Sequence, residues 1–187
     1  MVNLIVAITG ASGTLTAKLL VEKSPWPVNL IVSKWGGEVY QRETGNLNEL
    51  KKKVHQVYDN EDFFAPVSSG SVQTAGMVII PCSCNTLGEI ASGINNTLIS
   101  RAAHCHLKEG RKLILCLRES PLSLIEMENG ARIIRAGGVI MPISPPFYMM
   151  KDSDPEKITW KEVMNLFVDR VLSILGDTNH LTWENIR

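Results

Sequence analysis

Two cysteines, Cys82 and Cys84, stand one residue apart directly after an apolar run, in the stretch PCSCNT. Such a pair could bind a metal or form a redox couple. However, zinc sites favour two or more residues between paired ligands, and thiol redox pairs favour C-x-x-C. The third interpretation is a tight turn that opens a helix, with small hydrogen-bonding groups at Ser83, Asn85 and Thr86. We prefer this interpretation, in which both cysteines are small apolar residues and no metal is bound.

Polar residues also follow the other apolar runs of the sequence. Gly10-Ala11-Ser12-Gly13 follows the first run. Its glycines allow a tight turn, and the amides at a helix start suit an anion. The third glycine of a dinucleotide-binding fingerprint is missing. Ser33-Lys34 follows the second run and is equally well explained as a plain helix cap. Arg118-Glu119-Ser120-Pro121 and the segment from Pro142 to Tyr148 follow the last two runs. Ligands of open α/β sheets lie outside the carboxyl ends of the strands, so these segments are candidates for one binding site.

The elements that position these residues alternate along the chain. Five apolar runs are predicted to be buried strands, at 3–9, 28–33, 77–81, 112–117 and 139–142. Helical spacing predicts helices between them, starting near residue 15 and then at 35–42, 46–57, about 87–91, 98–108, about 122–135 and 160–175. The stretch 59–73 is predicted to be a loop with a short helical turn. Near-continuous apolar strands separated by helices are typical of a parallel sheet covered on both faces. The sequence therefore predicts one α/β domain over 1–187, a three-layer doubly wound fold that is flavodoxin-like (Rossmann-like), with about five core strands and a C-terminal helix and short tail from about 159.

Composition narrows the class of protein. The chain has 187 residues, 44% of them hydrophobic, and a formal net charge of zero, so no basic excess indicates nucleic acid. No apolar run approaches the ~20 residues of a membrane helix. The first predicted strand begins within three residues, which leaves no room for a signal peptide, and the four cysteines are not needed as disulfides. We expect a cytoplasmic protein that binds neither nucleic acid nor membrane.

Several short motifs occur together, in a fixed order and over essentially the whole chain to about Gly176. They are GASG after the first strand, SSGS from Ser68 to Ser71, PCSxxTL, RAAxxxLKE, LxLxxREsPL and a PxxPxFY ending at Tyr148. This set resembles the flavin prenyltransferases, the UbiX/Pad-type flavoproteins. PCSCNT is also similar to the P-A-S-A-N-T signature of the wider flavoprotein group that includes the cysteine decarboxylases. The resemblance implies that the turn holds flavin mononucleotide (FMN).

The resemblance also implies a reaction. Members of this family join a dimethylallyl group from dimethylallyl monophosphate to N5 and C6 of reduced FMN, closing a fourth, non-aromatic ring without a metal. The prenylated FMN then passes to decarboxylases of the UbiD type. The family typically assembles as a dodecamer with active sites at subunit junctions, so a homo-dodecamer is expected.

Family positions can be carried over to this sequence. Those that bind the flavin correspond to Gly10, Ala11, Ser12, Ser33, Ser83, Cys84, Asn85, Thr86 and Arg118. Those that bind the prenyl phosphate correspond to Arg101, Lys108, Tyr148 and Arg170, some of them from a neighbouring subunit. The residues expected to take part in the chemistry are Ser12, Glu43, Lys108, Glu119, Tyr148 and Arg170. Among these, Glu119 matches the catalytic glutamate that handles protons near N5 and C6, and Glu43 matches a second acidic position in the site.

Plain structural explanations exist for the same residues. Arg170 is also explained as a surface arginine, Lys108 as a cation favoured at a helix end, and Glu119 as a partner of Arg118. Tyr148 is equally explained as a core or interface residue. The sequence departs from the family where Phe63-Phe64 replaces a tryptophan and where LKEGR replaces LKERR.

Two other functions remain open. One is an FMN-dependent decarboxylase of peptidyl or pantothenoyl cysteine, which shares the fold. It is disfavoured because PISPPFYMM has no asparagine for the P-x-M-N motif and because none of the four histidines falls in the corresponding loop. The other is a non-catalytic FMN carrier, which would have no use for a pocket that accepts a leaving phosphate.

Overall fold

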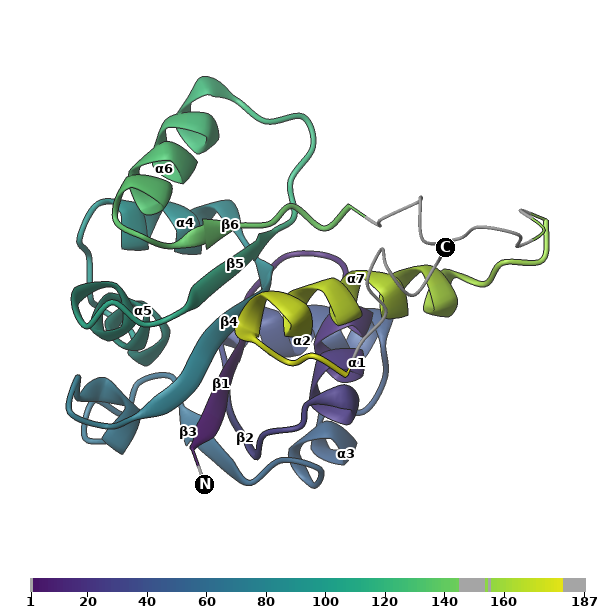
Figure 1. The fold of residues 1–187 in the computed structure, drawn as a ribbon, viewed down its shortest axis with the longest axis horizontal. Helices are drawn as coiled ribbons and strands as arrows, with labels where there is room; N and C mark the ends of the chain where they lie inside the picture. The colour runs from purple at the N-terminus through teal and green to yellow at the C-terminus, as the bar shows by residue number, and fades with distance from the viewer. Residues whose placement is uncertain (1, 145–153, 155, 180–187) are drawn as a thin grey trace.

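A six-stranded parallel sheet forms the centre of the molecule (Figure 1). The computed structural model describes residues 2–144, 154 and 156–179. The strands are β1 (Asn3–Ile8), β2 (Val28–Val32), β3 (Gln56–Asp59), β4 (Thr74–Cys82), β5 (Leu113–Leu117) and β6 (Val139–Ile140). They lie in the order β3-β2-β1-β4-β5-β6, and every pairing is parallel. The strand order changes direction between β1 and β4, which is the switch point of a doubly wound sheet.

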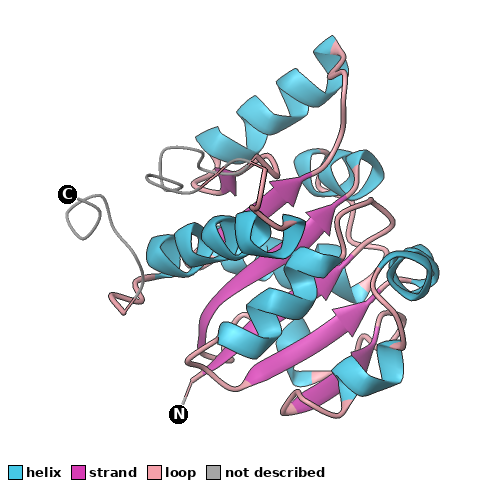
Figure 2. Cartoon of the chain, turned by 90° about the vertical axis from the view of Figure 1, so that its right-hand side faces the viewer, coloured by secondary structure: helices cyan, strands magenta, loops and turns pink. Residues whose placement is uncertain are grey.

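Helices cover both faces of the sheet (Figure 2). One face packs against α1 (Leu15–Lys23), α2 (Lys34–Glu43), α3 (Leu47–Lys51) and α7 (Trp160–Leu175). The other face packs against α4 (Cys84–Ala91), α5 (Leu98–Lys108) and α6 (Leu124–Arg135). Successive residues of β1 point to opposite faces, so Leu4 belongs to the first core and Ile5 to the second. Burial on both sides explains why the strands read as continuous apolar runs. The predicted three-layer fold is confirmed.

The prediction of five strands and of one helix over 46–57 was wrong. Leu47 and Leu50 are buried on α3, as the helical spacing predicts, but α3 ends at Lys51. The N–H of His55 then donates a hydrogen bond to the carbonyl oxygen of Val28 (2.9 Å), and the chain continues as the edge strand β3. A strand of four residues that is exposed at both ends has too short an alternation to be told from the last turns of a helix.

The weakly patterned stretch 59–73 is confirmed as a loop with a short helical turn. It contains the end of β3 and one 3₁₀ turn, η1 (Pro66–Ser68), in which Val67 is buried against α5 and its neighbours. No helix within 2–144 or 156–179 has both the length and the apolar character to cross a membrane.

Candidate active site

Thr9 ties together the carboxyl ends of the two central strands, β1 and β4. Its hydroxyl donates a hydrogen bond to the carbonyl oxygen of Pro81 (2.9 Å) and accepts one from the N–H of Ser83 (2.8 Å). The side chain is buried, so these bonds are shielded from water. Thr9 therefore sets the spacing between the Gly10–Gly13 turn and the PCSCNT turn. Sequence reasoning missed this residue, although a threonine that closes an apolar run was a usable signal.

Two helices begin at this edge, each capped by a serine. Ser83 is the N-cap of α4, and its Oγ accepts from the N–H of Thr86 (3.3 Å) and lies 3.1 Å from Thr86 Oγ1. Ser33 is the N-cap of α2 and accepts from the N–H of Gly36 (3.0 Å). The plain explanation of Ser33 as a helix cap is thus confirmed. Helix starts also carry unpaired N–H groups and partial positive charge, which suit a phosphate.

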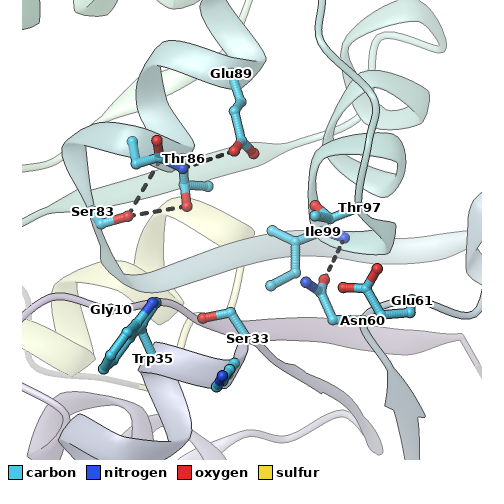
Figure 3. Close-up of a pocket in the computed structure, with 12 residues that line it drawn as sticks. Gly10, Ser33, Trp35, Asn60, Glu61, Ser83, Thr86, Glu89, Thr97 and Ile99 are labelled. Atoms are coloured by element: carbon cyan, nitrogen blue, oxygen red, sulfur yellow. Dashed lines mark hydrogen bonds between the residues drawn. The ribbon is translucent and has the colours of Figure 1, made fainter.

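A cavity of about 480 Å³ lies between these helix starts (Figure 3). Gly10, Ser33, Ser83 and Thr86 line one part of it. The far part is lined by Asn60, which follows β3, and by the first residues of α5. Asn60 is buried and accepts a hydrogen bond from the N–H of Ile99 (3.1 Å), which joins the two walls. Sequence reasoning missed Asn60 because the strand before it was assigned to a helix.

A second cavity of about 270 Å³ adjoins the first and shares Gly10 and Ser83 with it. It is lined by Gly10, Ala11, Ser12, Ser83, Cys84, Arg118 and Glu119. All nine residues predicted to bind the flavin line one or both cavities. They come from the ends of four segments that are far apart in sequence. The structure therefore brings the whole predicted flavin set together at the switch point.

Glu43, the last residue of α2, clamps the turn after β1. Its Oε2 accepts hydrogen bonds from the N–H of Gly13 (2.8 Å) and from the N–H and hydroxyl of Thr14 (both 3.1 Å). Partial burial by itself raises the pKa of Glu43, but the hydrogen bonds from Ser12, Thr14 and Gly13 outweigh it and hold the pKa below its ordinary value. Glu43 is therefore an anion that fixes the position of Ser12.

Glu119 and Cys84 are in contact inside the smaller cavity. The thiol of Cys84 donates to Glu119 Oε2 (3.4 Å), and the N–H of Ser120 donates to Oε1 (3.0 Å). Burial, followed by the adjacent Glu119 carboxylate, raises the pKa of the Cys84 thiol to about 11. Cys84 is accordingly a protonated thiol at neutral pH and a poor nucleophile. Burial also raises the pKa of Cys82, which packs in the core as a small apolar residue.

Residues 2–144, 154 and 156–179 contain no group of three or more His, Cys, Asp or Glu side chains arranged to hold a metal ion. All four cysteines are free thiols, and three of them are buried.

Arg101, Lys108 and Arg111 surround the loop Ser68–Val72 and form what we call the α5 basic cluster. Arg101 Nε donates to the carbonyl oxygen of Ser68 (3.0 Å), and Arg111 donates to the carbonyl oxygens of Gly70 and Val72. Lys108 Nζ pairs with Glu109 (2.5 Å). A Cβ placed on Gly70 would lie 2.6 Å from Lys108 Nζ, so this loop runs directly beneath the lysine. Arg111 and Gly70 were not singled out in the sequence, although SSGS belongs to the family motifs.

The α5 basic cluster does not reach the flavin cavities within one chain. α5 runs antiparallel to the strands, beginning at the larger cavity with Ile99 and ending at Lys108, just before the amino end of β5. A helix of 11 residues spans about 16 Å, so Lys108 lies at the opposite edge of the sheet. Arg170 is exposed on α7, donates to Ser173 Oγ (3.4 Å) and lines neither cavity. Tyr148 lies outside the described residues.

Comparisons with known proteins identify the relatives of this chain. A model of the flavoprotein family matches residues 1–172. The flavin prenyltransferase UbiX of Methanocaldococcus jannaschii is 40% identical over 182 residues, covering 96% of both chains.

Two solved structures are similar over 97% of this chain. The first, AnUbiX (PadA1) in complex with FMN and dimethylallyl pyrophosphate, is 33% identical over 97% of that chain, with a TM-score of 0.88. The second, a dodecameric FMN-dependent Ubix-like decarboxylase from Escherichia coli O157:H7, is 36% identical over 98% of that chain, with a TM-score of 0.86. This chain therefore belongs to the flavoprotein family and, within it, to the flavin prenyltransferases of the UbiX type.

Proposed function

We propose that the protein binds FMN in the two adjoining cavities and transfers a dimethylallyl group from dimethylallyl monophosphate to N5 and C6 of reduced FMN. One observation carries the proposal: the nine residues assigned to the flavin line two cavities that meet at Gly10 and Ser83. The relative solved with FMN and dimethylallyl pyrophosphate supports both the cofactor and the class of prenyl donor.

The cavities fit the chemistry of FMN. The larger one, about 480 Å³, is within the range usual for cofactor sites. The hydroxyls of Ser33, Ser83 and Thr86, together with the N–H groups at the starts of α2 and α4, suit the phosphate group. Gly10 allows close packing there, because a Cβ on it would lie 2.7 Å from the Cβ of Trp35.

Different side chains of the chain take different roles in the proposed reaction. Reduced FMN supplies the atoms that accept the dimethylallyl group. Glu119 is placed to take and return protons, since its carboxylate lines the cavity and is oriented by the Ser120 N–H. Ser12 shares that cavity and is held by Glu43, whose own carboxylate is occupied by hydrogen bonds. We therefore assign Glu43 a positioning role.

The leaving phosphate requires positive charge, and the chain holds it in the α5 basic cluster. Arg and Lys stabilise a phosphate through charge-assisted hydrogen bonds. Because Lys108 lies at the far end of α5 and Arg101 lines neither cavity, we propose that Arg101 and Lys108 act on the flavin site of another copy, with Tyr148 and Arg170 as further phosphate ligands.

An apolar surface on and just before α6 supports assembly into a homo-dodecamer. Large apolar side chains are exposed there, with exposures of 40 to 72%: Leu122, Leu124, Ile125, Met127 and Ile134. Four of these side chains lie on α6 and one just before it, and several large apolar side chains exposed on one helix are typical of an interface. The solved dodecameric relative from E. coli supports this oligomer. We further propose that the product serves a UbiD-type decarboxylase in the cytoplasm.

The proposal is tested by the mass of the flavin. Purified protein is incubated anaerobically with reduced FMN and dimethylallyl monophosphate. The mass of the extracted flavin is then measured by mass spectrometry. Wild type is expected to give prenylated FMN, while Glu119→Gln and Lys108→Ala lower its yield. Glu49→Gln and Lys51→Ala, which change exposed charges on α3, are matched controls with wild-type yield. Tight FMN binding with unchanged flavin mass would favour the non-catalytic carrier instead.

A further inference from the structure

The thiol of Cys84 contacts the acid–base residue of the proposed reaction. Cys84 is the first residue of α4, directly after the cap Ser83, and its Sγ lies 3.4 Å from Glu119 Oε2. Both residues line the smaller cavity. The other three cysteines of the chain are buried, and neither cavity is lined by them. Cys84 is therefore the one thiol placed beside the reacting edge of the proposed flavin site.

The contact determines where the Glu119 carboxylate points. Glu119 lies in an exposed segment after β5, where a glutamate side chain has several rotamers of similar energy. Oε1 is held by the N–H of the next residue, Ser120, which leaves the direction of Oε2 free. In the described part of the chain, Cys84 is the only side chain that hydrogen-bonds to Glu119.

The base of this contact is rigid. Ser83 is tied to the buried Thr9, and the N–H of Arg118 donates to the carbonyl oxygen of Cys82 (3.1 Å). The last residues of β1, β4 and β5 are thus joined by hydrogen bonds immediately below the Cys84–Glu119 pair. The thiol and the glutamate consequently start from backbone positions that are fixed relative to each other.

We propose that Cys84 is a positioning residue whose S–H group orients Glu119 for proton transfer; this rests on the proposed prenyl transfer. A thiol is a weak hydrogen-bond donor, so it directs the carboxylate without binding it as strongly as a hydroxyl or amide would. Glu119 then keeps a fixed direction and remains free to exchange a proton. The protonated state of the thiol, which its burial favours, supplies the donor that this role needs.

The kinetic test compares Cys84→Ala, which removes the donor, with Cys84→Ser, which restores one. Loss of one such hydrogen bond is expected to lower kcat of Cys84→Ala about 5-fold at saturating FMN, with KM for dimethylallyl monophosphate unchanged. Cys84→Ser should recover part of the lost rate, because its hydroxyl restores a donor but binds the carboxylate more strongly than a thiol does. A wild-type kcat in Cys84→Ala, or a Cys84→Ser variant no faster than Cys84→Ala, would overturn the proposal. Unfolding temperatures of both variants confirm that the fold is kept.

A second measurement separates this proposal from the proposed function. The infrared S–H stretching band of Cys84 is assigned as the band that disappears in Cys84→Ala. Replacing the carboxylate in Glu119→Gln leaves a weaker acceptor, so the band is expected to move to higher wavenumber. An unchanged band position would show that the thiol does not hydrogen-bond to Glu119 and would overturn the proposal. If wild type forms no prenylated flavin, prenyl transfer fails, and the band alone decides whether Cys84 holds Glu119.

Discussion

The flavin cavities and the α5 basic cluster are built in different ways. The cavities are shaped by backbone turns and helix caps that are joined by hydrogen bonds, such as those of Thr9 and Ser83. The cluster consists of long cationic side chains laid over a loop, and the side chain of Lys108 is 53% exposed. The cavities bring together all nine residues assigned to the flavin within one chain, whereas no residue of the α5 basic cluster lines either cavity. Under the proposed function, one chain holds the flavin site and only part of a site for prenyl transfer.

The difference suggests how the two regions contribute to catalysis. A rigid pocket positions a cofactor because its groups cannot relax away from it. An exposed cation such as Lys108 can meet an anion held by another subunit without rebuilding either fold. This division of roles can be broken or confirmed by changing one region at a time.

Mixing two inactive variants should restore activity if the flavin cavities of one copy are completed by the α5 basic cluster of another copy. Lys108→Ala and Glu119→Gln are each expected to lower prenyl transfer by about 100-fold or more, because each removes a charged group from the transition state. Co-assembled at equal amounts, they should regain activity in about a quarter of the sites, since a site then draws its lysine and its glutamate from different copies. The measurement is prenylated FMN formed per protein chain.

The control for this mixture replaces one member with the double variant Lys108→Ala, Glu119→Gln, which can complete no site when mixed with Lys108→Ala. Activity equal to the simple sum of the two single variants would contradict sharing between copies.

Glycine substitutions should separate the rigid region from the adaptable one. A Cβ on Gly36, in α2, would collide with the backbone carbonyl of Ile8, and Gly36→Ala is expected to lower the free energy of unfolding by about 3 kcal/mol. A Cβ on Gly70 meets the far ends of Lys108 and Glu109, which can move aside, so Gly70→Ala should cost less than about 1 kcal/mol. Denaturant unfolding measures both, and an equal loss in the two variants would refute the contrast.

Binding of FMN should depend on the cavities and not on the cluster. Ser83→Ala removes the cap of α4 and a hydroxyl from the cavity, and we expect FMN to bind about 10-fold more weakly. Lys108→Ala should leave the Kd of FMN unchanged while it lowers prenyl transfer. Quenching of flavin fluorescence during titration reports both constants. Similar losses of affinity in the two variants would show that the cluster belongs to the flavin site.

The smallest expected effect is on the stability of the fold at acidic pH. The pKa of Glu43 is lowered in the folded state from its ordinary value of 4.5, so its hydrogen bonds stabilise the fold above that value and are lost as the pH falls through the folded pKa. Glu43→Gln should therefore show a smaller drop in unfolding temperature between about pH 6 and pH 3 than wild type. Superimposable curves would mean that the clamp on Gly13 and Thr14 contributes nothing to stability.

Much of the fold and of the flavin site could be predicted because the information was local. Each apolar run that became a buried strand was followed by its own polar turn, and parallel strands bring those turns to one edge. β3 was missed because four residues are too few to show a period. Thr9 was missed because its partner, Ser83, is distant in sequence, and Asn60 was missed together with the strand before it.

The sequence by itself determined the class of fold, the family and the nine residues assigned to the flavin, since strand periodicity, helix caps and short motifs act over a few neighbouring residues. Only the tertiary structure decided that Lys108 and Ser83 lie at opposite edges of the sheet, and that Cys84 meets Glu119. The physical reason is that such placements depend on the order in which strands pair and on the direction in which α5 crosses between them.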